Sequence, residues 1–249
     1  MQGKAAIVTG GASGLGEATA LEFVSRGAGV CIADLQPAGE KVAATIRENG
    51  GKAIYVPVDV TSEADVANMI DATKKEFGRL DFAYNNAGVL EDRAPTADIP
   101  VEQWNRVINV NLTGVWMCLR AEVPAMLETG GGVIVNTSSM AGRYGGASWH
   151  MAAYGASKAG VISLTRVAAR DYARDNIRVL AVCPGAIDTP MLRGTREANP
   201  EWAAEMAASK PFGRFGRADE IAKTVVWLCS DDASYISGDA LAVDGASYV

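Results

Sequence analysis

Tyr154 and Lys158 are the two side chains in this sequence best suited to move a proton. They stand four residues apart in Tyr-Gly-Ala-Ser-Lys, so a helix places them on one face. An ammonium favours ionisation of a neighbouring phenol. Two unit charges about 4 Å apart interact by about 4 kcal/mol at an effective dielectric of about 20, or roughly three pKa units. The spacing therefore predicts a phenol of lowered pKa that exchanges a proton near neutral pH. The same spacing also occurs on ordinary helices, where the pair does no chemistry.

A glycine-rich turn near the N-terminus is typical of a phosphate-binding loop. The apolar run 4–9 is too short for a helix, and it leads through three glycines into a helix-like segment over 15–26. Gly10 can adopt backbone angles closed to other residues, Gly14 lets a pyrophosphate approach the backbone, and Gly16 allows a helix to pack closely on a strand. The pattern predicts a strand, a phosphate-cradling turn and a helix N-terminus. The alternative is a glycine turn without a ligand.

Asp34 ends the next apolar run, which covers residues 29–34. It stands roughly twenty residues beyond the glycines, where a carboxylate can accept hydrogen bonds from both hydroxyls of an adenosine ribose. A 2′-phosphate would meet like charge there, at a cost of several kcal/mol in a partly buried site. The residue therefore favours NAD over NADP. The alternative is an aspartate that only caps a turn or a helix.

Six motifs, in this order and spacing, resemble those of the short-chain dehydrogenase/reductase family. They are Thr9-Gly10-x-x-x-Gly14-x-Gly16, Asn85-Asn86-Ala87-Gly88, Asn111-Leu112-x-Gly114, Ser139, Tyr154-x-x-x-Lys158 and Pro184-Gly185. The resemblance covers essentially all 249 residues. It implies one Rossmann-type domain over 1–249, with a substrate lid around 189–215.

The resemblance also implies a role for each catalytic residue. Tyr154 would be the general base in alcohol oxidation and the acid in ketone reduction, while Lys158 would lower its pKa and hold the nicotinamide ribose. Ser139 would hydrogen-bond the substrate oxygen, with Ser138 as the rival assignment. Asn111 would perturb a helix and hold a water that links the lysine to solvent. The alternative for Asn111 is a polar residue that closes a helix irregularity.

Residues at the ends of several strands are expected to hold the cofactor. By resemblance, the Asp59 side chain and the Val60 backbone meet the adenine, and the Ile187 backbone and the Thr189 hydroxyl bind the carboxamide. The expected cofactor-binding residues are Gly10, Ser13, Gly14, Leu15, Gly16, Asp34, Asp59, Val60, Asn86, Ala87, Gly88, Tyr154, Lys158, Pro184, Gly185, Ile187 and Thr189. A capping aspartate, an asparagine-glycine loop and a proline-glycine turn are the alternatives for three of these segments.

Large apolar side chains in two segments could line a substrate pocket or merely pack. Trp149, Met151 and Met191 are the expected substrate contacts, together with Ser139; Trp202 and Met206 belong to the same segments. His150 is the only histidine of the chain and has no partner ligands in the sequence, so we predict a residue of a loop or pocket wall and no metal site.

Composition narrows the possible partners and compartment. The net charge of −6, without a local Lys/Arg cluster, argues against a nucleic-acid or an anionic membrane surface. No apolar run approaches transmembrane length, and the first strand leaves no room for a signal peptide. The four cysteines are widely separated and apolar in context, which is typical of buried thiols in a reducing compartment. The sequence therefore predicts a cytoplasmic protein.

Short apolar runs alternate with longer amphipathic segments along the whole chain. Strands are expected near 4–9, 29–33, 53–57, 80–84, 132–136, 177–183 and 240–243. The segment 62–77 has apolar residues at helical spacing behind a Thr-Ser cap signal. This alternation predicts an α/β fold, a doubly wound parallel sheet of about seven strands with helices on both faces. Two departures from the family pattern are Leu180, where asparagine is frequent, and Ala246, where a second glycine is frequent.

The sequence favours an NAD-dependent dehydrogenase that acts on a secondary alcohol, or on the ketone, of an apolar small molecule. One alternative is an NADPH-dependent 3-oxoacyl-thioester or quinone-type reductase, which Asp34 disfavours. Another is a non-catalytic nucleotide-binding scaffold, which the intact Ser139, Tyr154 and Lys158 set argues against. The segments 101–127 and 155–173 carry more apolar surface than one sheet-facing stripe requires, which predicts a homotetramer with two-fold axes.

Overall fold

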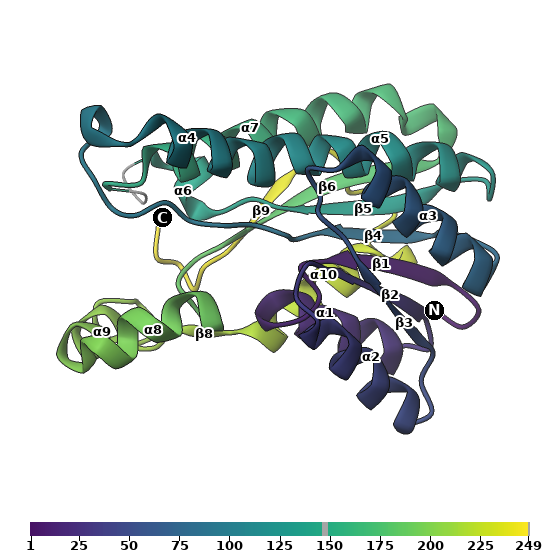
Figure 1. Ribbon diagram of the computed structural model, residues 1–249, viewed down its shortest axis with the longest axis horizontal. Coiled ribbons are helices and arrows are strands. Elements are labelled where there is room, and N and C mark those ends of the chain that lie inside the picture. Colours follow the sequence, from purple (N-terminus) through teal and green to yellow (C-terminus); the bar gives the residue numbers. More distant parts are fainter. Residues whose placement is uncertain (146–148, 249) are drawn as a thin grey trace.

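Seven parallel strands form one sheet, in the order β3-β2-β1-β4-β5-β6-β9 (Figure 1). The computed structural model describes residues 1–145 and 149–248, and the side chains of these except 194–196. The strands are β1 Ala5–Thr9, β2 Gly29–Asp34, β3 Ala53–Pro57, β4 Phe82–Asn85, β5 Gly132–Thr137, β6 Ile177–Pro184 and β9 Ala240–Val243. All seven predicted strands are confirmed. Their carboxyl ends meet at one edge of the sheet, where open α/β sheets bind ligands.

Helices cover both faces of the sheet, as the alternating pattern predicts. One face packs against α1 Gly14–Ser25, α2 Ala38–Glu48 and α10 Ala218–Leu228. The other packs against α3 Glu63–Phe77, α5 Gly114–Leu127 and α7 Ala152–Asp171, with α4 Val101–Ile108 at the end of α5 (Figure 1). Along β1 and β2, successive side chains alternate between the two cores, since strand residues point to opposite faces.

Helix α3 shows how the sequence sets the boundaries of one element. The Ser62 side chain accepts a hydrogen bond from the Asp65 N–H at 3.3 Å, and Gly78 ends the helix with a φ of +75°. Val66 and Met69 are buried against the sheet. The predicted helix over 62–77 and its cap are therefore confirmed.

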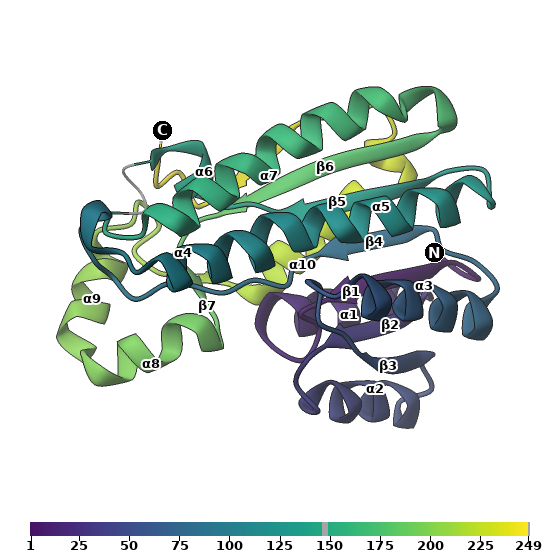
Figure 2. The ribbon, with the colours of Figure 1, turned by 45° about the horizontal axis from the view of Figure 1, so that its top comes forward.

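Three features of the fold lie outside the periodic pattern of strands and helices. The segment 101–127 is one rod, but a wider, π-helical turn over Asn109–Thr113 separates α4 from α5, at the residue expected to perturb a helix, Asn111. Two-residue strands β7 Ile187–Asp188 and β8 Gly216–Arg217 pair beside the main sheet, too short to leave a sequence signal. They flank α8 Pro190–Ala198 and α9 Pro200–Ala208, which project away from the sheet (Figure 2). The short helix α6 Met140–Arg143 follows β5.

The two departures from the family pattern have different structural outcomes. Leu180 is an ordinary core residue of β6, 1% exposed. Ala246 takes a φ of +60°, the left-handed region, which costs an L-residue roughly 1–2 kcal/mol relative to glycine. Within the described ranges, no helix is long and apolar enough to cross a bilayer.

Candidate active site

A cavity of about 540 Å³ opens at the carboxyl edge of the sheet. Most of the residues expected to bind cofactor or substrate lie on its wall. They are Gly10, Ser13, Gly14, Leu15, Asp34, Asp59, Val60, Asn86, Ala87, Gly88, Ser139, Met151, Tyr154, Lys158, Pro184, Gly185, Ile187, Thr189 and Met191. Three expected residues, Gly16, Asn111 and Trp149, are not on this wall. Their places in the structure are described below.

The glycine turn after β1 leaves the N-terminus of α1 facing the cavity. Gly10 and Gly14 have φ values of +65° and +58°, so a side chain would be strained at both positions. Ser13 makes no side-chain cap on α1 within the described chain, which leaves the first N–H groups of α1 available to an anion. Gly16 serves packing instead, because a Cβ there would collide with the Gly10 carbonyl oxygen. The turn has the geometry of a pyrophosphate cradle.

Asp34 stands at the end of β2 with both carboxylate oxygens already engaged. One oxygen accepts from the Ala12 N–H at 3.0 Å and the other from the Gln36 N–H at 2.8 Å. These bonds fix the carboxylate at the cavity wall beside the glycine turn. Each carboxylate oxygen has a second lone pair, so the group can still accept from ribose hydroxyls. The capping role and the ribose-binding role are therefore compatible.

Asp59 and Val60 lie on the wall after β3. The Asp59 carboxylate accepts hydrogen bonds from the Thr61 N–H at 2.8 Å and from the Thr61 hydroxyl at 2.7 Å. This is the capping arrangement that the sequence left open. It also holds the Val60 backbone in place at the cavity, 7% exposed.

The loop after β4 is tied to the glycine turn by one hydroxyl. Thr9 Oγ1 accepts from the N–H groups of Asn86 at 2.9 Å and Ala87 at 3.1 Å. In return, the Asn86 side chain donates to the Thr9 carbonyl at 3.1 Å. Two segments that are far apart in the sequence thus form one continuous wall of the cavity.

Asn111 lies behind the wall, fully buried in the π-helical turn. Its side chain accepts from the Val89 N–H at 2.8 Å and donates to the Val89 carbonyl at 2.9 Å. A Cβ added at Gly88 would lie 3.3 Å from Asn111 Oδ1 and 3.7 Å from Lys158 Nζ. Asn111 therefore holds the loop that follows Gly88 in place. Gly88 lies between Asn111 and Lys158, where there is little room for a larger side chain.

Tyr154 lies on the wall in the first turn of α7, next to Ser139 from the end of β5. Burial raises the pKa of the Tyr154 phenol, the hydrogen bond with Ser139 opposes that rise, and the charge of Glu91 adds to it. This differs from the lowered pKa expected from the Tyr-x-x-x-Lys spacing. Desolvation of the phenol is the largest cause of the rise.

Lys158 shares the α7 face with Tyr154, and its ammonium lies over the Tyr154 ring. Lys158 Nζ donates to the Thr137 carbonyl at 2.7 Å and lies 5.7 Å from the centre of the Tyr154 ring. Burial lowers the pKa of Lys158 to about 8, so its own charge weakens above neutral pH.

The two candidate serines have different partners. Ser138 is 1% exposed, and its hydroxyl donates to the Lys158 carbonyl at 2.8 Å. Ser139 begins α6, where its hydroxyl accepts from the Ala141 N–H at 3.1 Å, and it also hydrogen-bonds Tyr154. This arrangement favours Ser139 as the group that meets a substrate oxygen.

Glu91 is a residue of the site that sequence reasoning missed. It is 5% exposed, and both carboxylate oxygens accept from the Tyr154 N–H at 3.1 Å. The residue caps the N-terminus of α7, because Met151, the residue before the helix, makes no side-chain cap. Glu91 and Tyr154 are 63 residues apart in the sequence, so no local sequence pattern predicts their contact.

The segment after β6 lines the cavity beside the glycine turn. The Gly185 N–H donates to the Val243 carbonyl at 3.1 Å, and a Cβ at Gly185 would lie 2.8 Å from the Asp244 Cβ. Ile187 and Thr189 follow on the wall, and Thr189 lies beside Gly14, since a Cβ there would be 3.7 Å from the Thr189 Cβ. The expected carboxamide residues thus face the phosphate turn.

Apolar side chains from the segment 189–215 line the cavity. They are Met191, Leu192, Trp202 and Met206, and Met151, the residue before α7, joins them. Trp149 does not line this cavity; it is 74% exposed and packs on the His150 ring, 4.2 Å away. Sequence reasoning also missed two cations on the wall, Arg93 and Lys210.

The cysteines and the histidine take no part in a metal site among residues 1–145 and 149–248. No group of three or more His, Cys, Asp or Glu side chains there could hold a metal ion. All four cysteines are free thiols and buried. Burial raises the pKa of Cys31 and Cys229 to about 12, which makes both poor nucleophiles.

Known proteins resemble this chain over nearly its full length. A model of the family described as enoyl-(acyl carrier protein) reductase matches residues 10–246. The cis-4-hydroxycyclohexanecarboxylate dehydrogenase of Sinomonas cyclohexanicum is 44% identical, over 97% of this chain and 95% of its own. The 2,5-dichloro-2,5-cyclohexadiene-1,4-diol dehydrogenase of Sphingobium indicum is 42% identical, over 98% and 97%.

A solved structure agrees with the sequence comparison. The crystal structure of levodione reductase matches with a TM-score of 0.93 at 36% identity, over 98% of this chain and 97% of that one. The relatives imply a nicotinamide cofactor and a small-molecule substrate. Sequence motifs, sheet topology and these matches together show that the chain belongs to the short-chain dehydrogenase/reductase family of oxidoreductases.

Proposed function

We propose that this protein is an NAD-dependent dehydrogenase that oxidises a secondary alcohol on a small ring, or reduces the corresponding ketone. The observation that carries the proposal is the hydrogen-bonded pair of Tyr154 and Ser139 on the wall of the cavity. A phenol and a hydroxyl that share one space can hold an alcohol oxygen and take its proton.

The cavity wall fits a dinucleotide from end to end. The α1 N-terminus would receive the pyrophosphate, Asp34 the adenosine ribose, and Asp59 with Val60 the adenine. Lys158 would hold the other ribose, and Ile187 with Thr189 the carboxamide. The carboxylate of Asp34 favours a ribose with a free 2′-hydroxyl, and hence NAD. When bound, the nicotinamide supplies the hydride acceptor.

The protein's own residues would handle the proton and the substrate oxygen. The Ser139 hydroxyl donates to the substrate oxygen, and ionised Tyr154 accepts the hydroxyl proton as oxidation proceeds. Tyr154 has a raised pKa in the free protein, so its ionisation needs additional positive charge nearby. Lys158 is the cationic side chain placed to supply part of that charge, and Asn111 keeps its loop in place.

The apolar outer wall and the relatives both favour a ring substrate. The two relatives are named for a hydroxycyclohexane acid and a cyclohexadiene diol. The methionines at 151, 191 and 206 offer an adaptable apolar surface for such a ring. Arg93 and Lys210 on the same wall favour a second candidate, a ring alcohol that carries a carboxylate.

We also propose that residues 189–215 act as a lid, that the protein is cytoplasmic and that it is a homotetramer. The lid proposal is supported by α8 and α9, which stand apart from the sheet and line the cavity (Figure 2). Four buried, unpaired thiols suit a reducing compartment. The tetramer is supported by exposed Trp104, Trp116 and Val167 on the outer helices.

A reduction assay with NAD and NADP over a panel of alcohols tests this function. We expect turnover of cyclohexanol and of 4-hydroxycyclohexanecarboxylate with NAD. Tyr154→Phe should lower the rate by more than about a hundredfold while NAD affinity stays within a few-fold. Tyr235→Phe, at a fully exposed position, is the matched control. A chain that binds NAD without turnover would instead be a scaffold, and turnover of 3-oxoacyl thioesters with NADPH alone would favour the reductase alternative.

A further inference from the structure

Glu122 is a fully buried carboxyl group in the middle of α5, outside the cavity wall. Several other acidic side chains do form ion pairs. They stand nearer solvent or, like Asp81, contact a lysine and an arginine. Within the described ranges, Glu122 forms no ion pair. An ionised, unpaired carboxylate in this position would carry a large desolvation cost.

The atoms around Glu122 are complementary to a protonated carboxyl. The Asn85 amide donates to Glu122 Oε2 at 3.0 Å. The other Glu122 oxygen, Oε1, and the Asn85 oxygen, Oδ1, are both buried without a hydrogen-bond partner. Two acceptors cannot satisfy each other, but a proton on Oε1 turns one of them into a donor. A carboxylic acid and an amide then pair through two hydrogen bonds, and both unpartnered atoms are satisfied.

We propose that Glu122 is a neutral carboxylic acid that donates its proton to Asn85 and thereby positions the active-site ends of β4 and β5. The pair of Glu122 and Asn85 begins a chain of side-chain hydrogen bonds. The Asn85 amide also donates to Asn136 Oδ1 at 3.0 Å, and the Asn136 amide donates to the Thr165 hydroxyl at 3.0 Å. Asn85 and Asn136 are direct neighbours in the pairing of β4 with β5.

Two members of this chain, Asn85 and Asn136, directly precede residues of the site in the sequence. Asn85 is followed by Asn86, Ala87 and Gly88, which form the cavity wall. Asn136 is followed by Thr137, whose carbonyl accepts from Lys158 Nζ at 2.7 Å. Through these neighbours, Glu122 acts as a positioning residue for the wall and for the lysine. It touches no reacting atom.

The positioning is sensitive to pH, because the carboxyl loses its donor on ionisation. Burial raises the pKa of Glu122 from 4.5 to about 8, and the bond from Asn85 opposes the rise. A carboxyl with a raised pKa in the folded state stabilises the fold at low pH. That contribution is lost as the pH rises from the unfolded value through about 8.

Few other groups that titrate face Glu122. On its own helix, Cys118 is buried, and burial first and then the Glu122 charge raise the pKa of its thiol. From β4, β5 and α7 the facing groups are the neutral Asn85, Asn136 and Thr165. From α3, Glu63 and Lys74 reach α5 only through exposed ion pairs with Arg120 and Glu128. Lys158 is held at the Thr137 carbonyl.

Three measurements on the whole protein test the proposal. Glu122→Gln keeps a donor and an acceptor in place, so we expect kcat and KM within about threefold of wild type near neutral pH. Glu122→Leu should lose at least about tenfold in kcat/KM, since Asn85 is left unpaired. Glu128→Gln, at the exposed residue just after the same helix, is the control and should match wild type throughout.

The pH dependence and an infrared spectrum give readouts that a merely structural role would not move. Thermal unfolding of wild type should lose stability as the pH rises towards about 8, and Glu122→Gln should lack that slope. The infrared difference between wild type and Glu122→Gln should show a protonated-carboxyl C=O band below this pH and none above it. Absence of the band near neutral pH, or equal activity losses in the Gln and Leu variants, would overturn the proposal.

The activity arm rests on the proposed dehydrogenase function, whereas the infrared and unfolding arms do not. If no substrate is turned over but the band and the slope appear, the proposed function fails and the neutral acid stands. If the enzyme is active and the band is missing, the proposed function stands and the neutral carboxylic acid at Glu122 is refuted. If Glu122→Leu does not fold, the Gln variant and the infrared spectrum still test whether Glu122 is a neutral acid.

Discussion

Both carboxylate oxygens of Glu91 accept a hydrogen bond from the backbone N–H of Tyr154, each at 3.1 Å. The proposed general base is thus held through its main chain by a buried negative charge. The contact caps α7, and the negative charge of Glu91 interacts favourably with the positive N-terminal end of the helix dipole. The same charge raises the pKa of the Tyr154 phenol. One side chain therefore contributes both to the stability of the helix and, after desolvation and the Ser139 hydrogen bond, to the pKa of the base.

Glu91→Gln should separate these two effects. The amide keeps an oxygen that accepts from the Tyr154 N–H, but the negative charge is gone, so the phenol ionises more easily and its pKa falls. We expect the rise of the oxidation rate with pH to move to lower pH, by up to about one unit. The pH profile of kcat/KM measures this shift. Asp92→Asn removes an exposed charge one residue away and should leave the profile in place; a profile unchanged by Glu91→Gln would show that the charge does not act on Tyr154.

Asp34 should control the choice of cofactor. In Asp34→Ala combined with Leu35→Arg, repulsion of a 2′-phosphate is removed and a partner for it is supplied, since the exposed Leu35 side chain lies on the cavity wall. We expect the ratio of kcat/KM for NADP to that for NAD to rise by at least about a hundredfold, or about 2.7 kcal/mol. Leu35→Arg alone is the control. Equal use of both cofactors by the wild type would show that Asp34 does not discriminate.

The two serines after β5 should fail in different ways when each is replaced by alanine. Ser139→Ala removes the hydroxyl beside Tyr154, so kcat should fall by about a hundredfold or more, and the lost bond from the Ala141 N–H should cost about 1 kcal/mol of stability as well. Ser138→Ala removes the bond to the Lys158 carbonyl, which should cost about 1 kcal/mol of stability and leave kcat nearly unchanged. Steady-state kinetics and thermal unfolding of both variants measure the difference. The opposite pattern would make Ser138 the catalytic serine.

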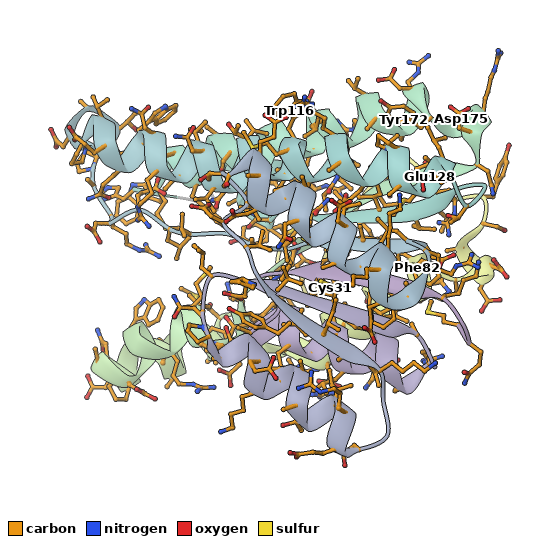
Figure 3. The ribbon with its side chains drawn as sticks, turned by 45° about the vertical axis from the view of Figure 1, so that its right-hand side comes forward. Cys31, Phe82, Trp116, Glu128, Tyr172 and Asp175 are labelled. Carbon is orange, nitrogen blue, oxygen red and sulfur yellow. The ribbon has the colours of Figure 1, made fainter. Side chains whose placement is uncertain are left out.

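Trp116 should lie in a contact between subunits. It projects from the outer side of α5, away from the sheet that contains Cys31, and is 45% exposed (Figure 3). An apolar ring of this size on an outer helix is typical of an interface core. We expect light scattering to give a tetramer for wild type and smaller species for Trp116→Glu, while Tyr235→Glu has no effect. A monomeric wild type at micromolar concentration would contradict the assembly.

The strands and the main helices could be predicted from sequence because their signals are local. Apolar runs and their spacing locate the seven strands and α3, and Ser62 and Gly78 mark the two ends of that helix. Periodicity did not place the π-helical turn at Asn111, which only the family resemblance led us to expect; the Asn111 side chain is hydrogen-bonded to Val89, 22 residues earlier. Periodicity carries no information about such partners.

Identity of the site residues could be predicted better than their electrostatics. Spacing places Tyr154 and Lys158 on one helix face, but burial and the direction of a long side chain set the pKa values. Those quantities depend on what the fold puts around each group. Trp149 was expected at the substrate because its segment flanks the site in the family, and its 74% exposure could not be predicted from that placement.

The Thr9 hydroxyl accepts hydrogen bonds from the N–H groups of Asn86 and Ala87, and these bonds affect how the cavity can open. Because it fastens the loop after β4 to the glycine turn, we expect these two sides of the cavity to move together. A bound dinucleotide would then leave past the proposed lid, residues 189–215. We therefore expect that the rate at which this segment opens, rather than any loosening of the phosphate turn, limits how often the enzyme can exchange its cofactor.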